Sequence, residues 1–242
     1  KDFEYGRILA PLDGFEAALR QFIAEGGQGG NVTAPFKEEA FRLCDRLSPR
    51  AQAAQAVNTL KLEADGTLVG DNTDGIGLVM DLRRFCLLAG KRVLLLGAGG
   101  ASRGVILPLA ADLPAEIVIA NRTASKAADL ASQFSAQIRV PISGVGLDQV
   151  EGAFDVIIDA TSASLGGQAF PLPASVFAPG CVAYEMVYGK GKTPFMQRAQ
   201  EAGVTQRVDG LGMLVFQAVE AFEVWTGLRP DARPIFDLLR AA

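Results

Sequence analysis

A short apolar strand followed by a glycine-rich turn restricts the fold of this chain more than any other segment. Residues 93–96 read Val-Leu-Leu-Leu, and residues 97–102 read Gly-Ala-Gly-Gly-Ala-Ser at the start of a helical pattern. Gly97 allows a tight turn, and Gly99 lets the backbone approach an anion at a helix N-terminus. Ser102 stands where a third glycine is usual, so the triplet alone is weak evidence. The strand before it and the helix after it favour a dinucleotide-binding turn.

Strands alternate with helices after this turn. Apolar strands are expected at 117–120, 154–160 and 181–186, with helices at 125–134 and 193–202 between them. Such alternation predicts a doubly wound parallel sheet of the Rossmann type, because each crossover helix covers a face of the sheet. We place this cofactor-binding domain at residues 75–212.

The first part of the chain predicts a smaller α/β domain. Its patterns indicate helices at 14–25 and from Pro35 onward, a short strand at 31–34 and a hairpin over 56–71 around Asp65-Gly66. The helices predicted at 211–225 and after Pro230 are expected to return to it. The substrate-binding domain is therefore predicted to comprise residues 1–74 and 213–242.

Composition excludes several classes of function. The chain has 242 residues, a net charge of −4 and no histidine. Acid–base chemistry near neutral pH must therefore use Lys, carboxylates, Tyr or Cys, and no metal site is expected. Without a basic field, nucleic acid is an unexpected partner. Three widely spaced cysteines indicate neither disulfides nor zinc, and no window suits a membrane span, so a cytoplasmic protein is expected.

The residues after the second strand of the sheet distinguish two dinucleotides. An NAD-specific site usually presents a carboxylate there, whereas this chain reads Asn121-Arg-Thr-Ala-Ser-Lys126. Arg122 can clamp a 2′-phosphate, Lys126 adds positive charge, and Asn121 or Thr123 adds hydrogen bonds. Taken singly, these residues are better explained as ordinary surface cations and an ordinary helix cap. Their place in the fold favours NADP.

Three polar residues of the first part are candidates for the chemistry. Lys37, Asn58 and Asp74 lie where strands end or helices begin. A lysine in the first turn of a helix opposes the helix dipole, which makes Lys37 unusual there. Individually they also fit a solvated lysine, a turn residue and an N-cap.

Six motifs in a fixed order resemble the shikimate dehydrogenase family. They are Asn31-Val-Thr-Ala-Pro-Phe-Lys-Glu, Ala56-Val-Asn-Thr-Leu, Gly70-Asp-Asn-Thr-Asp-Gly, Gly97-Ala-Gly-Gly-Ala-Ser-Arg, Asn121-Arg-Thr and Asp209-Gly-Leu-Gly-Met-Leu-Val-Phe-Gln. The resemblance covers nearly the whole chain. It implies NADPH-dependent, reversible reduction of 3-dehydroshikimate to shikimate in aromatic amino acid biosynthesis, by a monomer or homodimer acting on a small molecule.

The resemblance also implies roles for individual residues. Lys37 would be the acid/base group and Asp74 its carboxylate partner. Substrate hydroxyls would be held by Thr33, Asn58, Tyr188 and Gln217. The cofactor contacts would be Gly97, Ala98, Gly99, Gly100, Ala101, Asn121, Arg122, Thr123, Lys126 and, at the nicotinamide end, Met186 and Gly210.

Two departures and two alternatives accompany this interpretation. The printed sequence starts after the family's Ser-containing turn that grips the substrate carboxylate, so this fragment is expected to bind substrate poorly. Glu185 stands where the family commonly has Asp, a change expected to be tolerated. A dual quinate/shikimate dehydrogenase stays open, as does a non-catalytic NADP(H) sensor, although a sensor needs none of the four polar residues Lys37, Asp74, Asn58 and Gln217. The Tyr188-x-x-x-Lys192 pair of a short-chain dehydrogenase is rejected, because two glycines interrupt its helix.

Overall fold

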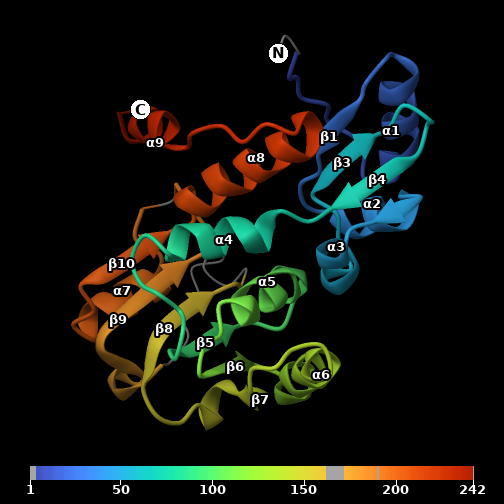
Figure 1. Cartoon of the computed structure of the whole chain (residues 1–242). Helices are drawn as coiled ribbons and strands as arrows, with labels where there is room; N and C mark the ends of the chain where they lie inside the picture. Colours follow the sequence, from blue (N-terminus) through green and yellow to red (C-terminus); the bar gives the residue numbers. More distant parts are fainter. Residues whose placement is uncertain (1–3, 162–171, 190, 242) are drawn as a thin grey trace. The chain divides into compact units, whose positions relative to one another are not determined.

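The chain divides into two compact units. The computed structural model describes residues 4–161, 172–189 and 191–241 (Figure 1). The first unit is Lys1–Asn72 and the second is Thr73–Ala242. The predicted boundary after residue 74 lies two residues from this division. Residues 213–242 group with the second unit here, which differs from the predicted assignment; as a functional grouping that assignment stays a prediction.

The first unit is a four-stranded sheet with three helices. The strand order is β1-β3-β4-β2, in which β3 pairs antiparallel with β1 and β4, and β2 pairs parallel with β4. The predicted hairpin is confirmed: Gly66 N–H closes its turn on Glu63 O at 3.0 Å. The elements are α1 (Phe15–Ala24), β1 (Gly29–Asn31), α2 (Lys37–Leu43), β2 (Arg46–Leu47), α3 (Pro49–Ala54), β3 (Thr59–Leu62) and β4 (Leu68–Asp71).

Two details of the first unit differ from the sequence prediction. The strand expected at 31–34 ends at Asn31, and the helix expected from Pro35 begins at Lys37. The reason is a turn in which Phe36 N–H donates to Thr33 O at 3.0 Å, and which contains the cis Ala34–Pro35 peptide bond. The core beneath comes mostly from small and apolar side chains: Phe15, Val32, Ala40, Ala51, Val57, Leu60 and Leu68.

The second unit contains the predicted parallel sheet. Its six strands follow the order β10-β9-β8-β5-β6-β7 and every neighbouring pair is parallel, which is the doubly wound Rossmann order. The edge strands β7 and β10 were not predicted, because neither carries a continuous apolar run. The strands are β5 (Arg92–Leu96), β6 (Glu116–Asn121), β7 (Ile142–Gly146), β8 (Phe154–Asp159), β9 (Phe177–Glu185) and β10 (Gln206–Asp209).

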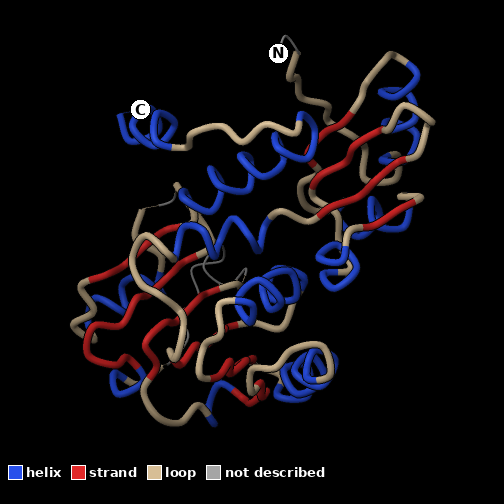
Figure 2. The backbone as a smooth tube through the Cα atoms, viewed as in Figure 1, coloured by secondary structure: helices blue, strands red, loops and turns tan. Residues whose placement is uncertain are grey.

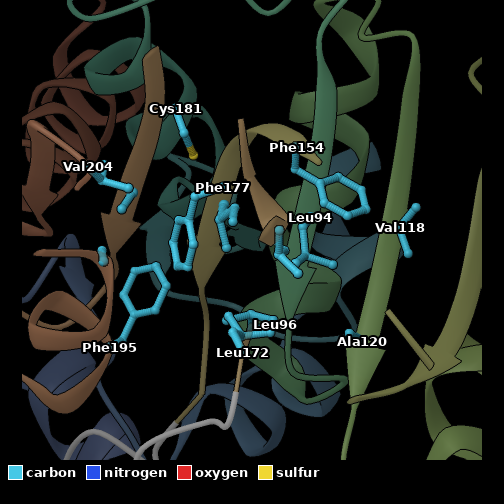
Figure 3. Packing of buried hydrophobic residues seen from close by; sticks show 14 residues of the cluster. Leu94, Leu96, Val118, Ala120, Phe154, Leu172, Phe177, Cys181, Phe195 and Val204 are labelled. Carbon is cyan, nitrogen blue, oxygen red and sulfur yellow. The ribbon is translucent and has the colours of Figure 1, made fainter. Parts of the chain in front are cut away.

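Helices cover both faces of this sheet (Figure 2). On one face, Phe195 of α7 joins a cluster with Leu94, Leu96 and Phe154 (Figure 3). On the other, Tyr184 of β9 donates a hydrogen bond to Asp81 of α4. The helices are α4 (Asp74–Leu82), α5 (Gly100–Ala111), α6 (Ala124–Ser135), α7 (Pro194–Glu201), α8 (Leu211–Thr226) and α9 (Arg233–Ala241).

Helix α8 lies against α4 at close range, because both present glycine at the contact. A Cβ atom on Gly77 would come within 2.8 Å of Met213 O and Gln217 N, and one on Gly212 within 2.0 Å of the Asp81 carboxylate. This close packing is why α8 groups with the second unit.

Candidate active site

The glycine-rich turn has the geometry that an anion site requires. Gly97 follows β5 with φ +103°, and a Cβ there would also meet Thr161 Cγ2 at 2.8 Å. Gly99 is the N-cap of α5, and within the described residues no atom lies within 4 Å of a Cβ built on Gly99 or Gly100. The backbone at the start of α5 is therefore open to a phosphate group, with the free N–H groups of a helix N-terminus.

Ser102 supports this turn in place of the missing third glycine. Its hydroxyl is buried and donates to Gly97 O at 2.8 Å. This bond gives the buried Gly97 carbonyl a hydrogen-bond donor inside the turn. The departure from three glycines is thus compatible with the predicted cofactor site.

The turn lies where ligands bind in doubly wound sheets. Strand β5 has β6 on one side and β8 on the other, so the chain direction of the crossovers reverses there. The residues directly after β8 are hydrogen-bonded to its last residue: the Asp159 carboxylate accepts from Thr161 N at 2.9 Å and from Thr161 Oγ1 at 2.7 Å.

The predicted 2′-phosphate residues follow β6 directly. Asn121 ends the strand, and its Nδ2 donates to Thr123 O at 3.0 Å. Arg122, Thr123 and Lys126 are exposed, and neither Arg122 nor Lys126 forms an ion pair with another described residue. Thr123 is the N-cap of α6 but makes no side-chain cap bond. Two cations are therefore available to an anion beside the carboxyl end of the sheet.

Met186 and Gly210 lie together at the ends of two neighbouring strands. Met186 follows β9, and its N–H donates to Asp159 O at 3.0 Å. Gly210 follows β10, its N–H donates to Val187 O at 3.2 Å, and a Cβ there would lie 2.1 Å from Met186 O. Only glycine fits this approach. Tyr188, two residues after Met186, is 47% exposed.

Three predicted residues meet in the first unit. Lys37 opens α2, and its carbonyl accepts from Val57 N at 2.8 Å. Asn58, which follows Val57, is buried. Its carbonyl accepts from Val32 N at 2.8 Å, and this bond places Thr33, the residue after Val32, beside Asn58. The Asn58 Oδ1 atom accepts from Thr59 Oγ1 at 2.8 Å. Long-range pairing therefore brings together Lys37, Asn58 and Thr33, which are up to 25 positions apart.

Asp74 and Gln217 belong to the second unit. Asp74 is the first residue of α4, and the preceding Thr73 donates its hydroxyl to Gln217 Oε1 at 3.4 Å. Gln217 lies on α8 beside Gly77. The close helix pair thus brings the two predicted residues to neighbouring turns.

Comparisons with known proteins decide the family. Residues 1–60 match the model for the shikimate dehydrogenase substrate binding domain, residues 81–166 that for shikimate / quinate 5-dehydrogenase, and residues 210–238 that for the shikimate 5′-dehydrogenase C-terminal domain. A shikimate dehydrogenase (NADP(+)) of Janthinobacterium sp. is 54% identical over 242 residues, which cover 99% of this chain and 87% of the relative. The chain belongs to the shikimate dehydrogenase family. The resemblance carried by the six motifs is confirmed.

Solved structures in and around the family agree with the fold. An Ael1 enzyme from Pseudomonas putida is 49% identical with a TM-score of 0.91, covering 99% of this chain and 88% of that one. A shikimate 5-dehydrogenase of Thermus thermophilus, solved with NADP(H) and shikimate, is 33% identical with a TM-score of 0.79, covering 96% and 85%. A 5-ketofructose reductase of Gluconobacter is 31% identical with a TM-score of 0.80, covering 93% and 82%. The predicted fold class is confirmed.

Asp71 and Asp81 are two of the buried carboxylates, and neither was predicted from the sequence as a site residue. Asp71 accepts two bonds from Arg50 at 2.7 Å and one from Ser48 at 2.5 Å. Burial raises the pKa of Asp71, but the bonds from Arg50 and Ser48 outweigh it, so the net pKa is below its ordinary value. Asp71 stands inside the third motif, next to the segment leading to Asp74, and that position was its one sequence signal.

Asp81 is the second of these carboxylates. It accepts from Tyr184 Oη at 2.9 Å and pairs with Arg84 at 2.6 Å. Burial raises the pKa of Asp81 despite both partners. Its only sequence signal was a charge within an apolar helix face.

The described residues contain no group of three or more His, Cys, Asp or Glu side chains able to hold a metal ion. Among the described helices, none has both the length and the apolar character of a membrane span.

Proposed function

We propose that this protein catalyses the NADPH-dependent, reversible reduction of 3-dehydroshikimate to shikimate in aromatic amino acid biosynthesis. The observation that carries the proposal is the combination of the open backbone at Gly99 and Gly100 with the exposed cations Arg122 and Lys126 at the carboxyl end of one parallel sheet. Family membership over the whole chain supports the same reaction.

The cofactor is assigned to the second unit. Gly97, Ala98, Gly99, Gly100 and Ala101 would receive the pyrophosphate at the N-terminus of α5. Asn121, Arg122, Thr123 and Lys126 would hold the 2′-phosphate, since a planar guanidinium can bind two phosphate oxygens at once. Met186 and Gly210 would contact the nicotinamide, and bound NADPH supplies the hydride.

Lys37 is assigned as the acid/base group, with Asp74 as its carboxylate partner. Negative charge develops on the ketone oxygen as the carbonyl is reduced, and a lysine ammonium both stabilises that charge and delivers the proton. In the reverse direction the Lys37 amine accepts the hydroxyl proton. No histidine competes for this role in the sequence.

Four polar side chains are assigned to the substrate. Thr33, Asn58, Tyr188 and Gln217 would bind hydroxyl groups, and a polyhydroxylated ring needs several donors and acceptors of this kind. These assignments make residues 213–242 act functionally with residues 1–74, although they pack in the second unit. We also infer a monomer or homodimer that does not bind nucleic acid and acts in the cytoplasm, where its free thiols Cys44, Cys86 and Cys181 would stay reduced.

A direct spectrophotometric assay tests the proposal. The full-length protein is mixed with shikimate or quinate and with NADP⁺ or NAD⁺, and absorbance of the reduced nicotinamide is followed. We expect turnover with shikimate and NADP⁺. If neither substrate is oxidised while NADP⁺ still binds, the proposal is wrong and the sensor interpretation is favoured.

A dual quinate/shikimate dehydrogenase is the second candidate. The family model matched by residues 81–166 is described for both substrates, and a ketone reductase with a different substrate has the same fold. Comparable kcat/KM values for shikimate and quinate in the same assay would favour it.

A further inference from the structure

Three neighbouring strands of the second unit end on an acidic residue in the same register. Asp159 of β8 lies opposite Glu185 of β9, which lies opposite Asp209 of β10. In each case a carboxylate oxygen accepts a hydrogen bond from the backbone N–H two residues later. The donors and distances are Thr161 at 2.9 Å, Val187 at 3.2 Å and Leu211 at 3.3 Å. Each acid therefore holds the backbone directly after its strand, at the carboxyl end of the sheet where ligands bind.

Glu185 differs from Asp209 in its burial, and one of its bonds reaches a residue eight positions along the chain. Its side chain is completely buried, whereas Asp209 is exposed. The Oε1 atom accepts from Val187 N, and the Oε2 atom accepts from Thr193 Oγ1 at 2.8 Å. Thr193 is the N-cap of α7, and its hydroxyl oxygen also accepts from Met196 N at 3.3 Å. Glu185 thus joins the end of β9 to the start of α7.

The segment bridged in this way carries two predicted site residues, Met186 and Tyr188. Met186 is the residue that packs against Gly210, and Tyr188 follows it in an exposed position. A completely buried carboxylate is costly unless its oxygens are bonded. The bonds of Glu185 to Val187 N and Thr193 Oγ1 therefore favour one placement of the neighbouring residues Met186 and Tyr188.

We propose that Glu185 is a positioning residue that holds Met186 and Tyr188 in place for the reaction. This inference rests on the proposed function, which gives Met186 a nicotinamide contact and Tyr188 a substrate contact. Two acceptor oxygens are required, and glutamine offers only one. The second of these oxygens, Oε2, is the one that accepts from the Thr193 hydroxyl.

Kinetics of three variants test this inference. We expect Glu185→Gln and Thr193→Val to lower kcat/KM for shikimate by about tenfold, the effect of losing one hydrogen bond to a charged group. Thr193→Ser keeps the hydroxyl, so its kcat/KM should stay within about twofold of that of the unchanged protein. The KM for NADP⁺ should change less, because Arg122 and Lys126 are untouched. Glu116→Gln is the matched control: Glu116 pairs with Arg92 at the amino ends of their strands.

Amide hydrogen exchange supplies a readout independent of turnover. The N–H groups of Val187 and Met196 bond to Glu185 and to Thr193, so we expect Glu185→Gln to speed exchange at Val187 and Thr193→Val to speed it at Met196. Unchanged kcat/KM in both variants overturns the inference. So does a loss that Thr193→Ser fails to rescue, since that indicates general destabilisation. If the unchanged protein turns over neither substrate, the proposed function falls, while faster exchange at Val187 in Glu185→Gln still supports the positioning of the segment.

Discussion

The predicted site residues of the two units are held by different kinds of structure. In the second unit, the glycine turn, Arg122 and Met186 all follow parallel strands, so a single sheet brings their loops to one edge. In the first unit, Lys37 and Asn58 meet only because the backbone of Val57 pairs with that of Lys37. The comparison teaches that the parallel βαβ arrangement of the second unit positions its predicted site residues, whereas individual long-range contacts position those of the first unit. Substitutions in the two units should therefore affect different measured quantities, namely turnover, cofactor binding or stability.

The largest effect is expected at Lys37. Replacing it with Ala should lower kcat by about 10²–10⁴-fold, the usual contribution of a positioned acid/base group, while the Kd of NADPH stays nearly constant. Steady-state kinetics and NADPH fluorescence titration measure the two quantities. Lys61→Ala in β3 serves as the control. Unchanged turnover in Lys37→Ala would remove Lys37 from the mechanism.

A smaller effect, confined to one cofactor, is expected at Arg122. Arg122→Ala should weaken NADP⁺ binding by about 10- to 100-fold, because hydrogen bonds to a charged group contribute about 1.5–3 kcal/mol. Binding of NAD⁺, which lacks the 2′-phosphate, should hardly change. Arg103→Ala is a suitable control, since Arg103 donates to Gln133 between α5 and α6. Equal weakening of both dinucleotides would contradict the NADP assignment.

Two glycines of the same turn should separate stability from binding. Gly97→Ala should lower the free energy of unfolding by about 1–3 kcal/mol, because its φ of +103° and its contact with Thr161 leave no room for a methyl group. Gly99→Ala meets no described protein atom, so it should keep its melting temperature and weaken both dinucleotides. Thermal unfolding and titration measure the two effects. If Gly99→Ala binds NADP⁺ normally, the pyrophosphate does not approach that residue.

A stability effect no larger than that of Gly97→Ala, and dependent on pH, is expected from Arg50 in the first unit. The pKa of Asp71 is lowered in the folded protein, so its contribution to stability is present above the unfolded pKa near 4 and is lost as the pH falls through the lower folded value. Arg50→Met should therefore cost about 1–3 kcal/mol at pH 7 and less near pH 3. Denaturant unfolding at the two pH values measures this. An equal cost at both would contradict the ion-pair explanation.

Local patterns predicted much of this molecule, and the misses have physical causes. Strand β5, the turn after it and helices α6 to α8 carry strong periodicity or glycine signals, and the structure contains them. Strands β7 and β10 lack apolar runs because edge strands are less buried, and α3 is too short for a clear helical period. The roles of Asp71 and Asp81 could not be predicted, because their partners Arg50 and Tyr184 lie 21 and 103 positions away.

The sequence by itself determined the type of cofactor domain, the family and the identity of the candidate residues, since each was carried by a short motif whose meaning is local. Tertiary structure decided which of those residues meet. The pairing of Val57 with Lys37, the approach of Gly210 to Met186 and the bridge from Glu185 to Thr193 all join separate elements. Such contacts depend on where the folded backbone brings two segments together, and no local sequence pattern encodes the distance between segments that are far apart in the chain.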